Sequence, residues 1–163
     1  MATHSESEIS PTIMAQIKES ADQAVSLLGR KSEDDPDLLI GAIDEFIDNW
    51  QNNKRPDLEI DAEDLPYLLG SLWGEQLVSQ FGWQWKAVTL HSNVKATAPG
   101  VVTTDRSLVV YPIHFIIGCL ADSSVDTTIL LSYNMLKAKK VPSASSGEYV
   151  DLMKNVFRIV PRA

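Results

Sequence analysis

The chain has 163 residues, of which 44% are hydrophobic and 22% charged, a composition typical of a soluble globular protein. No apolar run reaches the roughly 18 residues of a membrane-spanning helix, and the polar start MATHSESEIS lacks the pattern of a secretory signal. The single cysteine, Cys119, excludes an intramolecular disulfide and favours a cytoplasmic location, while a net charge of −8 disfavours binding to nucleic acid or anionic lipid.

Residues 1–9 are polar and acidic and show no hydrophobic periodicity, so we expect a disordered tail there. Two helices follow this tail. Ser10 and Asp35 each stand directly before a proline, an arrangement typical of a helix N-cap and the first helical position. Apolar residues recur at helical spacing behind both caps. Gly29 closes the first of these helices, and the segment NNKRPD ends the second.

A third helix is predicted to begin after Asp61 or Asp64 and to run to about Phe81. Gly82 supplies its C-terminal stop, because glycine readily adopts the left-handed conformation in which many helices end. Pro66 must then lie in the first turn, since deeper in the helix it would interrupt the backbone hydrogen bonds.

The stretch LLGSLWGEQLVSQFGWQW holds three of the four tryptophans and three of the eight glycines, so it calls for a physical explanation. Gly70 and Gly74 are four residues apart, which removes side chains from one strip of the third helix and lets a neighbouring element approach closely. Trp73 stands beside this strip and is expected to cover its rim. Trp83 and Trp85 share one strand face and can fill the space between sheet and helices. We expect this segment to be the central joint of the fold.

From Trp83 to His91 the hydrophobic period changes to two residues, which predicts a β-strand. Residues 93–100 read as a turn region. The segments GVVTT and SLVVY are rich in β-branched residues and are predicted to form a hairpin that turns at Asp105-Arg106. Pro112 ends the last of these three strands or confines it to an edge or bulge.

The rest of the chain is predicted to be mainly helical. The apolar run IHFIIGCL, residues 113–120, fits a buried helix or a fourth strand equally well, because its periodicity does not distinguish them. Ser123 with Asp126, and Ser145 with Glu148, resemble capping boxes for two further helices. The apolar residues of the last helix would be Tyr149, Leu152, Met153, Val156 and Phe157.

Helices, then strands, then helices follow one another without βαβ alternation, which predicts an α+β fold. We expect one domain over residues 10–163, with N-terminal helices, a small antiparallel β meander of about three strands, and C-terminal helices. The helices would pack on one face of the sheet.

The sequence holds no strong catalytic or metal-binding pattern. In GSLWG, Ser71 directly follows the first glycine, whereas a nucleophile elbow needs its serine at the centre of Gly-x-Ser-x-Gly. His4, His91 and His114 have no partner at metal-ligand spacing. Acids at residues 33–37 and 57–64 lack the central glycine of a calcium loop and stand at predicted helix starts, where they complement the helix dipole. We therefore expect no metal and no cofactor.

The charge is unevenly distributed along the chain. Residues 1–75 carry 17 acidic and 5 basic side chains, and residues 76–163 carry 5 and 9. Solubility is the simplest explanation of this asymmetry. A more specific hypothesis is that the chain is a non-enzymatic interaction protein, such as an inhibitor or immunity-type protein. It would bind a basic protein partner through its acidic helical half. The binding residues would be Glu33, Asp34, Asp35 and Asp37.

An alternative from another class is a small-molecule-binding protein or an enzyme. Its pocket would lie between the sheet and the third helix, with Glu75, Trp85 and His91 as the first residues to inspect. The lack of a catalytic pattern favours a non-enzymatic role without deciding the matter. A homo-oligomer with a structural role is a third hypothesis, and the sequence leaves the oligomeric state open.

One segment also carries a family resemblance. Leu69-Gly70, Gly74-Glu75 and Trp83-Gln84-Trp85, followed by Val109-Val110-Tyr111-Pro112, resemble a family of small bacterial proteins known as domain of unknown function 3806. The resemblance covers about 60 residues, from Asp61 to Leu120. It implies an α+β fold in a bacterial cytoplasm without an established activity. Short domains of this kind often resemble the immunity proteins of bacterial toxin systems, an inference by analogy.

Overall fold

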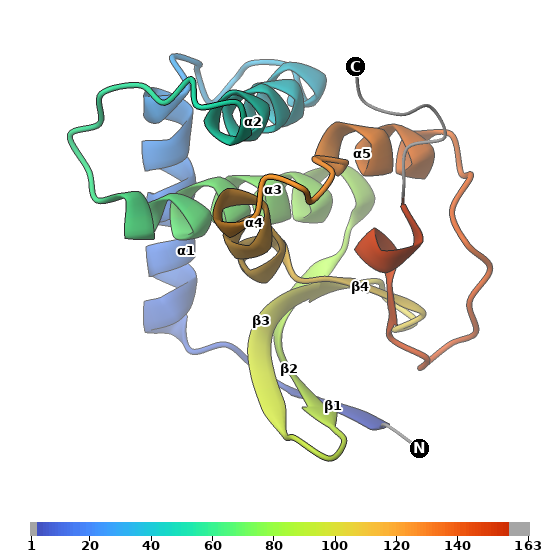
Figure 1. The fold of residues 1–163 in the computed structure, drawn as a ribbon. Coiled ribbons are helices and arrows are strands. Elements are labelled where there is room, and N and C mark those ends of the chain that lie inside the picture. The colour runs from blue at the N-terminus through green and yellow to red at the C-terminus, as the bar shows by residue number, and fades with distance from the viewer. Residues whose placement is uncertain (1–2, 157–163) are drawn as a thin grey trace.

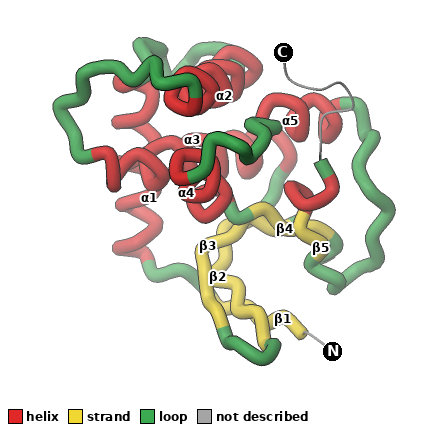
Figure 2. The backbone as a smooth tube through the Cα atoms, in the orientation of Figure 1, coloured by secondary structure: helices red, strands yellow, loops and turns green. Residues whose placement is uncertain are grey.

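The computed structural model describes residues 3–156 and has an α+β fold (Figure 1). The helices gather over one face of a twisted sheet, and the tip of the β2–β3 hairpin extends away from them (Figure 2). The helices are α1 (Pro11–Leu27), α2 (Pro36–Gln51), the 3₁₀ turn η1 (Ala62–Asp64), α3 (Leu65–Phe81), α4 (Pro112–Ala121), α5 (Ile129–Lys137) and the 3₁₀ turn η2 (Leu152–Asn155). The strands are β1 (Thr3–Ser7), β2 (Gln84–His91), β3 (Ala96–Val102), β4 (Leu108–Val110) and β5 (Val150–Asp151).

The five described strands lie in the order β1-β2-β3-β4-β5. All neighbouring pairs are antiparallel except β4 and β5, which are parallel. In the central register Trp85 stands opposite Val101, which in turn stands opposite Val110. These three side chains belong to the main core beneath the helices. The meander predicted from the sequence is therefore present, but it is extended by one strand at each edge.

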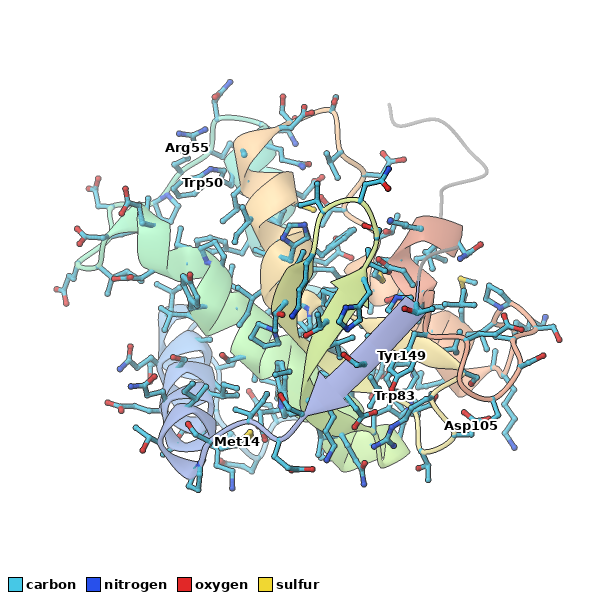
Figure 3. The ribbon with its side chains drawn as sticks, turned by 90° about the horizontal axis from the view of Figure 1, so that it is seen from below. Met14, Trp50, Arg55, Trp83, Asp105 and Tyr149 are labelled. Carbon is cyan, nitrogen blue, oxygen red and sulfur yellow. The ribbon has the colours of Figure 1, made fainter. Side chains whose placement is uncertain are left out.

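The expected disordered tail is wrong for the described residues of that segment. Thr3–Ser7 form the edge strand β1, which pairs with β2 (Figure 3). The Glu6 carboxylate accepts hydrogen bonds from the Arg106 guanidinium at 2.6 and 3.0 Å and from the Tyr149 hydroxyl at 2.7 Å. The segment is held by ladder bonds and by the ion pairs of Glu6 with Arg106 and of Glu8 with Lys86, so it needs no apolar periodicity to be ordered.

The predicted starts and stops of the first three helices are confirmed. The Ser10 hydroxyl accepts a hydrogen bond from the Ile13 N–H at 3.2 Å, and the Asp35 carboxylate accepts one from the Asp37 N–H at 2.9 Å. Gly82 ends α3 with a φ of 70°, in the left-handed region. These signals involve residues two or three positions apart, so they operate wherever the helix lies in the fold.

The glycine strip of α3 has the predicted role. A Cβ on Gly74 would lie 2.0 Å from the indole ring of Trp85, and a Cβ on Gly70 would lie 2.7 Å from the Cα of Ile113. The strip therefore lets the β2 tryptophan and the start of α4 approach the α3 backbone directly. Trp73 does not cover the rim of this strip, because its side chain is fully buried in the core.

The structure corrects the predicted turn at residues 93–100 and decides between helix and strand for residues 113–120. β3 begins at Ala96, so the predicted turn at residues 93–100 is wrong in its second half. Pro99 within that strand lacks an N–H, and its neighbours continue the pairing with β2. Residues 113–120 are helical in α4, with Pro112 in the first turn. Pro112 ends β4 and starts this helix.

The capping box predicted at Ser123 and Asp126 is wrong. The α5 helix begins at Ile129, and its own N-cap residue makes no side-chain capping bond. Its first turn is capped from α2 instead, where the Asp44 carboxylate accepts a hydrogen bond from the Leu130 N–H at 2.8 Å. A cap supplied by another helix cannot be found from local spacing.

The last predicted helix is also wrong. The Gly147 N–H donates to the Asp105 carbonyl at 2.9 Å, and the Val150 N–H donates to the Ser107 carbonyl at 2.9 Å. These bonds draw the segment against the β3–β4 hairpin, so up to Val156, where the described residues end, it forms strand β5 and the single turn η2 in place of a helix. Phe157, assigned to that helix, lies outside the described residues.

Candidate functional site

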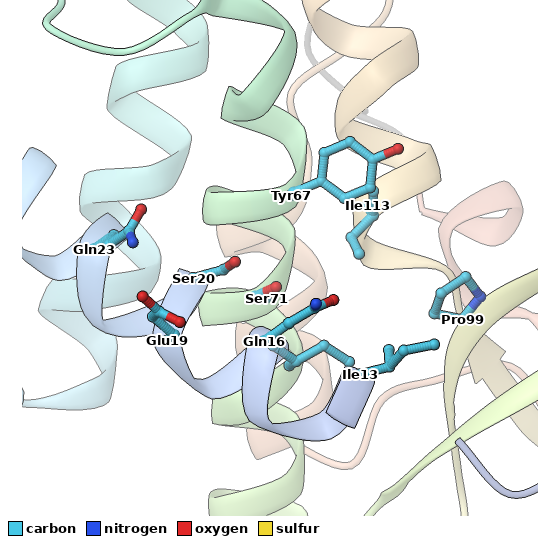
Figure 4. A pocket seen from close by; sticks show the side chains of 10 residues that line it. Ile13, Gln16, Glu19, Ser20, Gln23, Tyr67, Ser71, Pro99 and Ile113 are labelled. Atoms are coloured by element: carbon cyan, nitrogen blue, oxygen red, sulfur yellow. The ribbon is translucent and has the colours of Figure 1, made fainter. Parts of the chain in front are cut away.

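A groove runs along one side of α1. Its first part is an open hollow of about 440 Å³ bordered by α1, α3, the start of α4 and β3 (Figure 4). Ile13 and Gln16 reach it from α1, Tyr67 and Ser71 from α3, and Ile113 from α4. Ser71 is almost fully buried, so it lies at the floor.

The groove continues toward the segment that joins α2 to α3. A second hollow of about 530 Å³ lies between α1, the N-terminal part of α3 and residues 57–60. Gln23 of α1 lines both hollows. We call the two hollows together the α1 groove.

The α1 helix presents two adjacent faces because of its residue spacing, with Ile17 at their border. Its buried stripe consists of Ile17, Ala21, Ala24 and Val25 and packs into the core. A second stripe at intervals of three and four residues lines the α1 groove, which places it on one side of the helix. This stripe consists of Ile13, Gln16, Ser20, Gln23 and Leu27.

Large apolar side chains are exposed on the walls of the α1 groove. Ile13 on α1 is 46% exposed and Tyr67 on α3 is 53% exposed. Single exposed apolar residues are common on protein surfaces, but here two of them line the same hollow above the apolar Ile17 and Ile113. The groove therefore offers apolar surface that a bound chain can cover.

The charged residues that line the α1 groove are all acidic. Glu19 lines the first hollow, and Asp57 and Glu59 line the second. No lysine, arginine or histidine is among the lining residues of either hollow. The electrostatic potential in the groove therefore favours a positively charged ligand.

The acidic cluster predicted as the binding site has mostly structural partners. Asp34 accepts a hydrogen bond from the Lys31 N–H at 2.9 Å, Asp35 caps α2, and Asp37 forms an ion pair with Lys137 at 2.7 Å. Glu33 is exposed and, within residues 3–156, makes no hydrogen bond or ion pair. None of the four lines the α1 groove.

The structure brings together only two of the three residues predicted around a pocket between the sheet and α3. The Trp85 indole N–H donates to the Glu75 carboxylate at 3.3 Å. His91 lies at the far end of β2, where its ring bonds the Ser5 hydroxyl at 2.7 Å. Glu75 instead lines a hollow of about 290 Å³ between α1, α2 and α3. The predicted three-residue pocket is therefore not formed.

The described residues also bear on metal binding and membrane insertion. Within residues 3–156, no three histidine, cysteine, aspartate or glutamate side chains gather in a way that could hold a metal ion. None of the helices described in this range is long and apolar enough to cross a membrane.

Sequence reasoning missed the α1 groove because its walls come from distant parts of the chain. Ile13 and Tyr67 are far apart in sequence, and both count as core candidates by apolar periodicity. The available signal was the second stripe on α1, where apolar and amide side chains recur beside the buried stripe. Comparison of the chain with protein-family models, curated proteins and solved structures finds no match.

Proposed function

We propose that this protein is a non-enzymatic interaction module that binds a basic, amphipathic segment of a partner protein in the α1 groove. The observation that carries this proposal is the combination of exposed apolar walls with an exclusively acidic set of charged lining residues. A cytoplasmic inhibitor or immunity-type protein is the form of this function that the family resemblance suggests.

Apolar burial would supply most of the affinity. Full burial of a large apolar side chain stabilises by about 1.5–3 kcal/mol, and roughly half of the Ile13 and Tyr67 surfaces is still exposed. Covering both side chains would therefore contribute on the order of 2 kcal/mol. Apolar groups of the partner that enter the groove would add a similar contribution.

The acidic residues would mainly set specificity and association rate. Glu19, Asp57 and Glu59 line an open groove, where water and salt screen their attraction for lysine or arginine. Such charges steer encounter and reject acidic partners more than they increase affinity. We expect binding that weakens with salt but persists at high ionic strength through the apolar contacts.

The proposal can be tested with a displayed library of random peptides that are selected on the folded protein. Selected peptides should be enriched in Lys and Arg alternating with large apolar residues. Binding should weaken when Ile13 is changed to Ser, and also when Glu19, Asp57 and Glu59 are neutralised together. Glu33→Gln is the matched control, because it removes one acid of the same half outside the groove.

The control also separates the two acidic regions. If Glu33→Gln weakens binding and the groove variants do not, the partner binds at the segment between α1 and α2 and the groove proposal is wrong. Selection of acidic peptides, or of no peptide by a folded sample, also contradicts the proposal.

A further inference from the structure

A second cleft lies apart from the α1 groove, between α4 and the segment formed by β5 and η2. Its volume is about 160 Å³, well below the roughly 300–1,000 Å³ of sites that hold drug-sized ligands. Only a small molecule fits a space of this size. The cleft is lined by Tyr111, His114, Phe115, Asp151, Met153 and Lys154.

Asp151 supplies a half-buried carboxylate to this cleft. Its position is set by the pairing of β5 with β4, where Asp151 stands opposite Val109, and by a hydrogen bond that its carboxylate accepts from the Met153 N–H at 3.1 Å. Among residues 3–156 Asp151 forms no ion pair. Burial raises the pKa of Asp151 more than its hydrogen bond from Met153 and the nearby Lys154 and His114 lower it, so the carboxylate is incompletely compensated for its lost hydration. A cationic ligand group would offset that cost.

Tyr111 places a phenol beside the same carboxylate. Burial and the nearby Asp151 raise the pKa of Tyr111 to about 12, so its hydroxyl keeps its proton at physiological pH. The hydroxyl can therefore donate a hydrogen bond to a ligand oxygen. The Tyr111 ring and the Phe115 ring also provide aromatic surface to the cleft.

The basic residues of the cleft lie at its surface. His114 and Lys154 are exposed, whereas Met153 is buried and Phe115 is partly buried. The cleft thus combines one half-buried carboxylate, one exposed ammonium and an apolar wall. A ligand with only an amino group would leave Lys154 without a counter-charge. A ligand with only a carboxylate would be repelled by Asp151. A zwitterion satisfies both charges at once.

We propose that this cleft binds a free α-amino acid with a small apolar side chain. The ligand ammonium would contact Asp151, its carboxylate would contact Lys154 and the Tyr111 hydroxyl, and its side chain would lie against Phe115 and Met153. The site is independent of the α1 groove, with which it shares no lining residue.

The test is an NMR titration of the isotope-labelled protein with L-valine. Isobutylamine and isovaleric acid serve as probes that each lack one charge, and L-tryptophan serves as a probe too large for the cleft. L-Valine should shift the amide signals of Asp151, Met153 and Phe115 in a saturable way. The three other probes should bind on the order of tenfold more weakly or not at all.

Two variants then test whether Asp151 and Lys154 contact the two charged groups of the ligand. Asp151→Asn keeps a capping oxygen for η2, and Lys154→Gln changes an exposed side chain, so both should fold. Each should weaken L-valine binding on the order of tenfold, while Lys140→Gln, outside the cleft, should leave it unchanged. No saturable shift with L-valine, equal binding of isobutylamine, or unchanged binding by Asp151→Asn would each overturn the proposal.

Discussion

The substitution Gly74→Ala tests the close packing of Trp85 against the α3 backbone. The added Cβ would lie 2.0 Å from one carbon of the Trp85 ring and 2.5 Å from another. Carbon atoms in favourable contact are about 3.5–4.0 Å apart, so either the ring or the α3 backbone must move by roughly 1.5 Å. Trp85 is nearly buried and hydrogen-bonded to Glu75, which limits the room for such a shift.

Two opposing effects determine how much Gly74→Ala changes the free energy of unfolding. Replacing glycine by alanine inside a helix stabilises by up to about 1 kcal/mol. Overpacking of a core costs about 1–3 kcal/mol, and loss of the indole hydrogen bond to Glu75 adds about 1 kcal/mol. Because the ring carbons are rigid, the clash dominates. We expect a net destabilisation of about 2 kcal/mol, which lowers the melting temperature by about 4–8 °C in a protein of this size.

The assay is thermal and urea unfolding followed by circular dichroism, with Gly41→Ala as the matched control. Gly41 lies inside α2, and a Cβ there would meet no atom within 4 Å. Gly41→Ala should therefore raise stability by up to about 1 kcal/mol. If Gly74→Ala raises stability by the same amount, the packing argument is refuted. In a Trp85→Leu background the cost of Gly74→Ala should largely disappear, because the clashing ring is absent.

Two further predictions concern contacts between distant segments. The Arg106 hydrogen bond holds the pKa of Glu6 below its usual value of 4.5, so this contact stabilises the fold above that pH and loses its effect as pH falls through the lower folded-state pKa. Glu6→Gln should lower the free energy of unfolding by about 1–2 kcal/mol at pH 7 and reduce the further loss of stability at acid pH. An equal loss of stability with falling pH in the variant and the unchanged protein would contradict this. Asp44→Ala should cost about 0.5–2 kcal/mol by uncapping α5, with faster amide exchange at Leu130, and unchanged exchange there would count against the cap.

Local signals explain why α1, α2 and α3 could be predicted. Ser10 and Asp35 bond N–H groups two or three residues away, and Gly82 ends α3 through its own backbone conformation. The glycine strip was also predictable, since the spacing of Gly70 and Gly74 determines that both lie on one side of the helix. The element that packs against this strip comes from elsewhere in the chain. The spacing predicts that some neighbouring element approaches closely there, but it does not determine which one.

The errors have a common physical origin. The β1 strand gains its order from β2 and from Arg106, 100 residues from Glu6. The α5 helix takes its cap from Asp44, and the expected last helix yields to backbone bonds with Asp105. In each case a long-range contact outcompetes a local preference. Spacing rules contain no information on such contacts.

The candidate site was less predictable than the fold. The sequence directed attention to the acidic half and to the acids at residues 33–37, most of which cap or pair within the protein. The α1 groove depends on which apolar side chains stay exposed. That property follows from how α1, α3 and α4 pack, so it becomes visible only in three dimensions.

Chemical-shift mapping of a selected basic peptide tests the central claim most directly. The peptide is added to the isotope-labelled protein, and the amide signals that move are assigned to the structure. We expect the largest shifts to fall on residues of the α1 groove, including Gln16, Gln23 and Tyr67, and to diminish with salt. Shifts centred on residues 33–37 or on the sheet edge at β1 would contradict it.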